Sequence, residues 1–132
     1  MRRQPSASGA GSVSFDGLKD TRVRAVAAMA PVGVVFSAAS LAAITIPVAL
    51  YTGDKDTFLV PRYHAEWVRQ NIVNADYHAI PNAGHYAFMD TPGMPIPSPD
   101  GDIGANPAGF DRAAFQKELA PALNQFFDHA LQ

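Results

Sequence analysis

The chain of 132 residues contains no cysteine. Disulfide bonds, a thiolate nucleophile and thiolate zinc sites are therefore excluded. Charged side chains are also few, at 17% of the residues, and their formal net charge of -2 gives no basic footprint. We therefore do not expect a nucleic-acid partner, because affinity for nucleic acids depends on Lys and Arg side chains that neutralise phosphates.

Long apolar runs are missing as well. The most apolar stretch, residues 23–50, is interrupted by two prolines, a glycine and two serines, so it cannot supply the ~20 uninterrupted apolar residues of a membrane span. Residues 1–12 are basic and then rich in Ser, Gly and Ala, without the apolar segment of a signal peptide. We therefore expect a soluble, cytoplasmic protein with a disordered arm over residues 1–20 and one folded domain over residues 21–132.

The rest of the chain alternates short apolar runs with amphipathic segments. This pattern predicts strands over 23–30, 46–51 and 76–80, and helices over 37–43, 61–73 and 111–130. Such alternation favours right-handed crossovers onto a parallel sheet. Three strands are few for a self-sufficient domain of this class, and the first would form an open edge. The predicted fold is therefore α/β, with about three parallel strands and flanking helices that form part of a larger sheet.

Several side chains of the predicted helices are expected to face the core. In chain order they are Leu41 and Ile44; Tyr63, Trp67, Val68 and Ile72; and Phe115, Leu119, Leu123, Phe126 and Phe127. Pro121 should kink or split the last helix, because proline removes one backbone hydrogen bond. Residues 90–108 hold five prolines and three glycines, which predicts a long loop.

Two turns carry the residue types from which a chemical site can be built. One predicted strand is followed by a Gly-x-x-Asp turn that ends at Asp56, and the next strand is followed by a Gly-His turn at His85. The carboxyl ends of parallel strands meet at one edge of the sheet, where α/β proteins place their sites. A carboxylate and an imidazole presented there can form the acid–base half of a catalytic triad.

These segments resemble the C-terminal third of the α/β-hydrolase family and are most similar to its dienelactone-hydrolase-like branch. The resemblance covers roughly residues 21–131, including the Gly-x-x-Asp…Pro segment, the Ala-Gly-His-Tyr turn and the Asn-Pro-Ala-Gly-Phe-Asp-Arg-Ala-Ala-Phe segment that leads into the last helix. In that family the acid follows the penultimate strand and the histidine follows the last one. The resemblance implies Asp56 as acid, with Asp54 as second choice, and His85 as general base, acting on a small-molecule ester or lactone.

The family's nucleophile is missing from this sequence. It is the serine of a Gly-x-Ser-x-Gly turn between a strand and a helix, and no such pentapeptide occurs here. The nearest candidates, Ser8 and Ser12, follow no predicted strand, so neither is expected to be the nucleophile. We expect the nucleophile on another polypeptide, or in a longer gene of which this chain is a truncated product.

The other histidines do not indicate a metal site. His64 is predicted to be solvated on a helix, His78 to bond locally within a strand, and His129 to lie near a helix C-terminus, where a cation is favoured. No pair of them has the spacing of metal ligands, so we expect neither a metal nor a cofactor.

Three functions remain open at this point. The first is an ester or lactone hydrolase in which Asp56 orients His85 and His85 activates a serine. The second is a non-catalytic remnant that acts as an interaction or structural module and self-associates through the exposed edge strand near residues 23–30. The third is a flavodoxin-like ligand-binding module in which the two side chains are incidental. The distance between Asp56 and His85 separates the first function from the third.

Overall fold

The computed structural model describes residues 20–99 and 101–132. The arm predicted over residues 1–20 therefore falls, except for its last residue, outside the described part, and so do Ser8 and Ser12. Within the described part, no helix combines the length and the apolar composition needed to cross a membrane.

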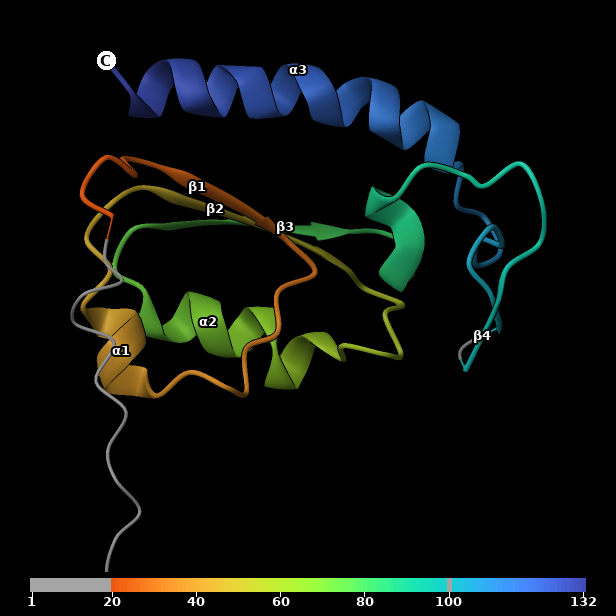
Figure 1. The fold of residues 1–132 in the computed structure, drawn as a ribbon, viewed down its shortest axis with the longest axis horizontal. Coiled ribbons are helices and arrows are strands. Elements are labelled where there is room, and N and C mark those ends of the chain that lie inside the picture. The colour runs from red at the N-terminus through yellow and green to blue at the C-terminus, as the bar shows by residue number, and fades with distance from the viewer. Residues whose placement is uncertain (1–19, 100) are drawn as a thin grey trace, which may run out of the picture.

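A parallel three-stranded sheet forms the centre of the fold (Figure 1). Its strands β1 (Val26–Met29), β2 (Val48–Gly53) and β3 (Ala75–Ile80) lie side by side in chain order. All six residues of the central strand β2 are buried, because helices cover both faces of the sheet. The predicted α/β class, with three parallel strands and flanking helices, is confirmed at this level of description.

Helices on the two faces give the fold three layers. The helices α1 (Ala38–Ala42) and α2 (Ala65–Asn71) cover one face of the sheet, and α3 (Arg112–Ala130) covers the other (Figure 1). The Ser37 side chain accepts a hydrogen bond from a free amide of the first turn of α1, and the Asp111 side chain does the same for α3. These N-caps define where the two helices begin.

The core is divided by the sheet into two clusters, and the alternation of β2 residues decides which side chain enters which cluster. Val48 and Leu50 point towards α1 and α2, whereas Ala49 and Tyr51 point towards α3. The first cluster is completed by the buried residues Leu41, Val68 and Ile72, and the second by Leu119, with Phe115, Leu123 and Phe126 packed against it. A register shift of one residue in β2 would exchange the two sets, so the core fixes the pairing of the sheet.

The segment predicted as one helix over residues 61–73 is divided in two. A 3₁₀ turn, η2 (Pro61–Tyr63), is followed by His64 with φ -120° and ψ -89°, and α2 begins only after it. This break rotates Tyr63 out of the apolar stripe, so its predicted place in the core is wrong and 57% of it is exposed.

Two further predictions about the C-terminal part need correction. The helix α3 passes through Pro121 as one continuous helix, so the proline does not split it. Phe127 is half-buried and contacts Phe126, but it does not belong to the core cluster. The loop predicted over 90–108 contains a small antiparallel pair, β4 (Pro97–Ser98) with β5 (Gly101–Asp102).

Candidate active site

Backbone contacts hold together the two turns at the carboxyl ends of β2 and β3. The amide of Asp54 donates to the Ile80 carbonyl at 3.1 Å, and the amide of Lys55 donates to the Ala83 carbonyl at 2.9 Å. Gly53 permits this approach, because a Cβ at its position would lie 2.3 Å from the Ala83 oxygen. The sheet therefore delivers both turns to the same rim.

The Asp56 carboxylate is buried in the first of these turns, with none of its side chain exposed. Its Oδ1 accepts hydrogen bonds from the amides of Phe58 at 2.9 Å and Leu59 at 2.7 Å. Its Oδ2 lies 2.9 Å from His85 Nδ1. These three hydrogen bonds offset the cost of removing a charged group from water, and they fix the direction in which Oδ2 points.

His85 is the first residue of the 3₁₀ turn η3 (His85–Phe88), which follows β3. Its side chain is 20% exposed, so the ring is anchored by Asp56 and still accessible to solvent. The rings of Phe58 and Tyr86 lie against it, at centroid distances of 4.9 Å and 5.0 Å. When Nδ1–H donates to the carboxylate, Nε2 is left as the proton acceptor.

The structure thus brings Asp56, rather than the second-choice Asp54, to the histidine. Asp54 lies on the exposed side of the same turn. The distance between Asp56 and His85 is that of a directed hydrogen bond. This is the arrangement in which a carboxylate orients a general base, and the catalytic role of the two residues stays a prediction.

A cavity of about 260 Å³ adjoins His85. One wall is formed by the turn after β2, including Lys55 and Thr57, and the facing wall by residues that precede or begin α3, including Asn106 and Arg112. The Pro- and Gly-rich segment predicted as a loop therefore contributes to a cavity that His85 also lines.

Sequence reasoning missed Arg112, which is only 2% exposed. Its Nε donates to Asn106 Oδ1 at 2.8 Å, and its Nη2 donates to the carbonyls of Ile103 at 2.9 Å and Ala105 at 2.8 Å. Nη1 is buried and has no hydrogen-bond partner among the described residues. Burial lowers the pKa of Arg112 from its ordinary value, and the charge of Asp102 offsets part of this effect.

The hydrogen bonds shown for the described serines do not lead to the His85 ring. Ser37 and Ser40 bond to each other at the start of α1. Ser98 Oγ accepts from the Tyr86 hydroxyl at 3.1 Å and donates to the Gly101 carbonyl at 2.7 Å. The geometry around His85 in residues 20–99 and 101–132 is therefore that of an acid–base pair.

No family model, no curated protein and no solved structure matches the chain. The comparisons therefore do not test the resemblance to α/β hydrolases, which stays a prediction.

The structure also corrects the prediction that His64 is solvated. The side chain is half-buried, and its Nδ1 accepts the amide of Gly33 at 3.1 Å. A Cβ at Gly33 would lie 2.3 Å from the His64 carbonyl oxygen, so this contact fastens the loop after β1 to the start of α2. Among residues 20–99 and 101–132, no group of three or more His, Asp or Glu side chains is suited to hold a metal ion.

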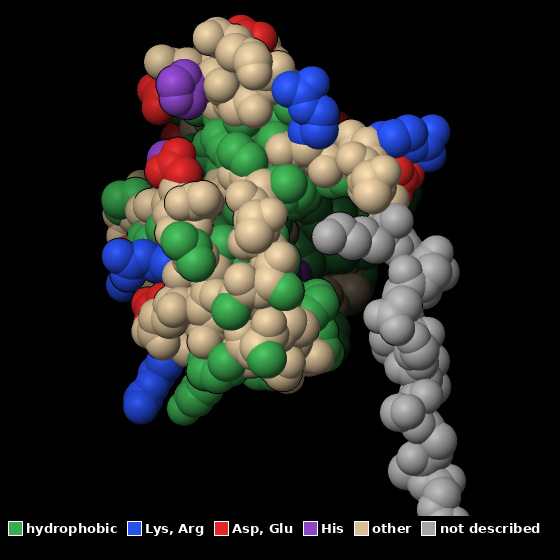
Figure 2. Space-filling view, turned by 90° about the vertical axis from the view of Figure 1, so that its left-hand side faces the viewer, with side chains coloured by type: hydrophobic (Ala, Val, Ile, Leu, Met, Phe, Trp, Pro, Cys, Tyr) green, Lys and Arg blue, Asp and Glu red, His purple; other side chains and the backbone are tan. Residues whose placement is uncertain are grey.

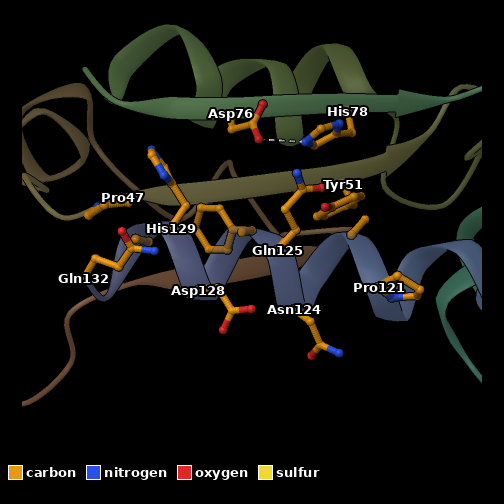
Figure 3. Close-up of a pocket in the computed structure, with 13 residues that line it drawn as sticks. Pro47, Tyr51, Asp76, His78, Pro121, Asn124, Gln125, Asp128, His129 and Gln132 are labelled. Carbon is orange, nitrogen blue, oxygen red and sulfur yellow. Dashed lines mark ion pairs between the residues drawn. The ribbon is translucent and has the colours of Figure 1, made fainter.

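A larger groove, of about 960 Å³, lies between α3 and the strands β2 and β3 (Figure 3). Asp76 Oδ2 is 3.0 Å from His78 Nε2, and the His78 ring stacks on Tyr51 with centroids 4.5 Å apart. Burial raises the pKa of Tyr51, and the negative charge of Asp76 adds to this effect. Gln125 and His129 point from α3 towards the strands (Figure 3). Because neither Asp56 nor His85 lines this groove, the smaller cavity is the candidate site.

Proposed function

We propose that this chain supplies the acid–base half of an α/β-hydrolase-like site that cleaves esters or lactones. The observation that carries the proposal is the 2.9 Å contact between Asp56 Oδ2 and His85 Nδ1 at the carboxyl ends of neighbouring parallel strands. In this proposal Asp56 holds the ring and stabilises the imidazolium. His85 Nε2 takes the proton from a serine hydroxyl as its oxygen attacks the carbonyl carbon, and then passes that proton to the leaving alcohol.

The second half-reaction uses the same pair. Water attacks the acyl-serine ester while Nε2 accepts the water proton, and the serine oxygen then recovers a proton from the ring. We place the serine outside this sequence, on another polypeptide or in a longer gene product, because residues 1–132 contain no Gly-x-Ser-x-Gly turn. The dienelactone-hydrolase-like motifs support an ester or lactone as substrate, and the exposed edge of His85 supports access for it.

Hydrolysis of p-nitrophenyl acetate by the purified chain tests the pair, since an oriented imidazole can activate water against this reactive ester without a serine. We expect protein-dependent release of p-nitrophenolate, most of which is lost in His85→Gln. Asp56→Asn should lower the rate by about tenfold or more, because the ring loses its orienting carboxylate. Asp54→Asn, which removes an exposed carboxylate from the same turn, should leave the rate unchanged.

The comparison of Asp54→Asn with Asp56→Asn separates the effect of the orienting carboxylate from that of a lost negative charge. Equal rates for the unaltered chain and His85→Gln would refute the proposal, because the release would then come from other surface groups. Equal losses of the hydrolysis rate in Asp54→Asn and Asp56→Asn would show that the rate depends on the net charge of the protein and not on the carboxylate that orients His85. Labelling with a fluorophosphonate, followed by peptide mapping, shows in addition whether a serine of this chain is activated.

A second candidate function is favoured by the edge of the sheet. Among the described residues, β1 pairs only with β2. Large hydrophobic side chains are exposed in β1 and in the loop that follows it, namely Met29, Val32, Val34, Val35 and Phe36. We infer from this surface an interaction module that associates through β1. Sedimentation as a compact monomer at high protein concentration would argue against this function.

A further inference from the structure

Positive charge dominates the described residues that line the cavity beside His85. Lys55 and Arg112 contribute two positive charges, and Asp102 contributes one negative charge. One carboxylate oxygen of Asp102 is already engaged by two backbone amides. The formal sum of these charges is therefore +1, and a group of charge -1 would balance it.

The charge of Arg112 is incompletely compensated inside the protein. Three hydrogen bonds go from the guanidinium to neutral oxygens, while Nη1 is buried without a partner among the described residues. Asp102 supplies part of the counter-charge, but one of its carboxylate oxygens is shared with two backbone amides, so the buried cation still favours a further anion nearby. Because Nη1 itself is covered, Arg112 would act on a ligand through its electrostatic field rather than by direct contact.

Direct hydrogen bonds would come from other residues of the cavity wall. Lys55 offers an ammonium group and Thr57 a hydroxyl. Asn106 uses its Oδ1 to accept from Arg112, so its amide nitrogen remains as a donor. The buried carboxylate of Asp56 opposes an anion, but it does not line the cavity, and its oxygens are engaged by two amides and the His85 ring.

We propose that this cavity binds a small monocarboxylate anion, with Lys55, Thr57 and Asn106 as its donors and Arg112 as the buried counter-charge. The volume of about 260 Å³ is just below the ~300–1,000 Å³ of sites for drug-sized ligands, which favours an anion smaller than a drug-sized ligand. The site goes beyond the proposed hydrolysis and does not require it, because binding needs no nucleophile.

Titration with sodium acetate, followed through the His85 Hε1 signal in NMR spectra, tests the site. Chloride keeps the ionic strength constant, and the signal is assigned by its loss in His85→Gln. We expect a saturable shift with acetate and no saturable shift with acetamide, which has the same shape without the charge. Lys55→Gln should weaken acetate binding by about fivefold.

Lys117→Gln is the matched control, because it removes the same charge from an exposed position of α3 that does not line the cavity. It should leave the acetate affinity unchanged. Absence of saturation in the unaltered chain, or equal weakening by the two lysine variants, would overturn the proposal. Acetate binding with no His85-dependent ester hydrolysis would refute only the proposed function, and hydrolysis without saturable acetate binding would refute only this site.

Discussion

The stability of the segment before α3 depends on pH through the Asp102 carboxylate. Its Oδ1 accepts the amides of Ile96 at 2.9 Å and Gly104 at 3.0 Å. The Gly104 bond first, then the Ile96 bond, lowers the pKa of Asp102 below its ordinary value of 3.8, and the charge of Arg112 acts in the same direction. Because the folded pKa is lower than the unfolded one, the carboxylate stabilises the fold above about pH 4, and this contribution is lost as the pH falls through the folded value.

Asp102→Asn tests this coupling, because asparagine keeps an acceptor oxygen and does not titrate. We expect lower stability than in the unaltered chain at pH 7, because the stabilising charge is gone, and a smaller further loss between about pH 4 and pH 2. Urea unfolding at a series of pH values measures both quantities. Asp102→Ala also removes the acceptor, so it should be less stable than Asp102→Asn at pH 7. A pH profile of Asp102→Asn that superimposes on that of the unaltered chain would contradict the assignment.

Single residues also show where prediction of the site succeeds and where it ends. Asp56 and His85 follow consecutive strands, and the general rule that parallel strands end at one rim is enough to bring them together. The preference for Asp56 over Asp54 comes from the family resemblance, because the strand-and-turn pattern alone does not say which of the two carboxylates the turn buries. The role of Arg112 was missed, although its spacing of three and seven residues from Phe115 and Leu119 places a charge on the apolar stripe of α3.

At the scale of elements, Gly53 controls how closely the ends of β2 and β3 approach. Gly53→Ala would place a Cβ 2.3 Å from the Ala83 carbonyl oxygen, which is backbone and cannot move away cheaply. We expect a loss of about 2–3 kcal/mol in the free energy of unfolding, together with a weakened Asp56–His85 contact. Gly93→Ala is the control, because a Cβ there meets nothing within 4 Å, and its effect should stay within about 0.5 kcal/mol. Equal stabilities of the two variants in urea unfolding would contradict this account.

Pro121 offers a second test within one element. It lies at an exposed position in the interior of α3, where it leaves the Lys117 carbonyl without its helical donor. Pro121→Ala should restore that bond and stabilise the protein by about 2 kcal/mol, since an interior proline costs about 3 kcal/mol and part of this is offset by the stiffer unfolded chain. Pro92→Ala, outside any helix, should instead lower stability by about 0.5 kcal/mol. Thermal unfolding checks both variants, because the melting temperature should rise in Pro121→Ala and fall in Pro92→Ala.

The wrong predictions among the elements lie mainly where regular spacing is interrupted or too short to read. Periodicity identified the three strands, the core-facing residues of α1 and, apart from Phe127, those of α3, because burial there follows the regular spacing of each element. It failed at Tyr63, where a break in backbone conformation at His64 interrupts the spacing. It also failed at the pairing of β4 with β5, because two-residue strands are too short to produce a pattern.

At the scale of the whole molecule, the surface shows where the layers are incompletely covered. Figure 2 shows hydrophobic side chains exposed between the α3 layer at the top and the layers below it, with charged side chains scattered around them. The two edge strands of the sheet, β1 and β3, differ in how strongly their side chains discourage pairing with another chain. β3 carries Asp76 and His78, and charges of this kind discourage pairing with another chain, whereas the sequence Val-Ala-Ala-Met of β1 has none.

Hydrogen bonding within the sheet identifies which amides of β1 are available to a partner. The amide of Val26 donates to the Pro47 carbonyl just before β2, and the amide of Ala30 donates to the Tyr51 carbonyl in β2. Because successive residues of a regular strand alternate in direction, the amide of Met29 faces the open side of the sheet. Met29→Pro therefore removes an edge donor without removing a bond to β2, a position where proline is tolerated. If β1 mediates self-association, sedimentation velocity should show concentration-dependent association of the unaltered chain and a monomer for Met29→Pro.

Met29→Ala tests the contribution of the side chain apart from that of the backbone amide, because it shortens the side chain and keeps the amide. It should continue to associate, since main-chain hydrogen bonds supply the affinity when an extended strand is added to a sheet. Loss of association in Met29→Ala and Met29→Pro alike would assign the contact to exposed hydrophobic surface instead. If the unaltered chain is a monomer, β1 does not pair with a second copy of the chain. The interaction function would then lose the support that self-association gives it.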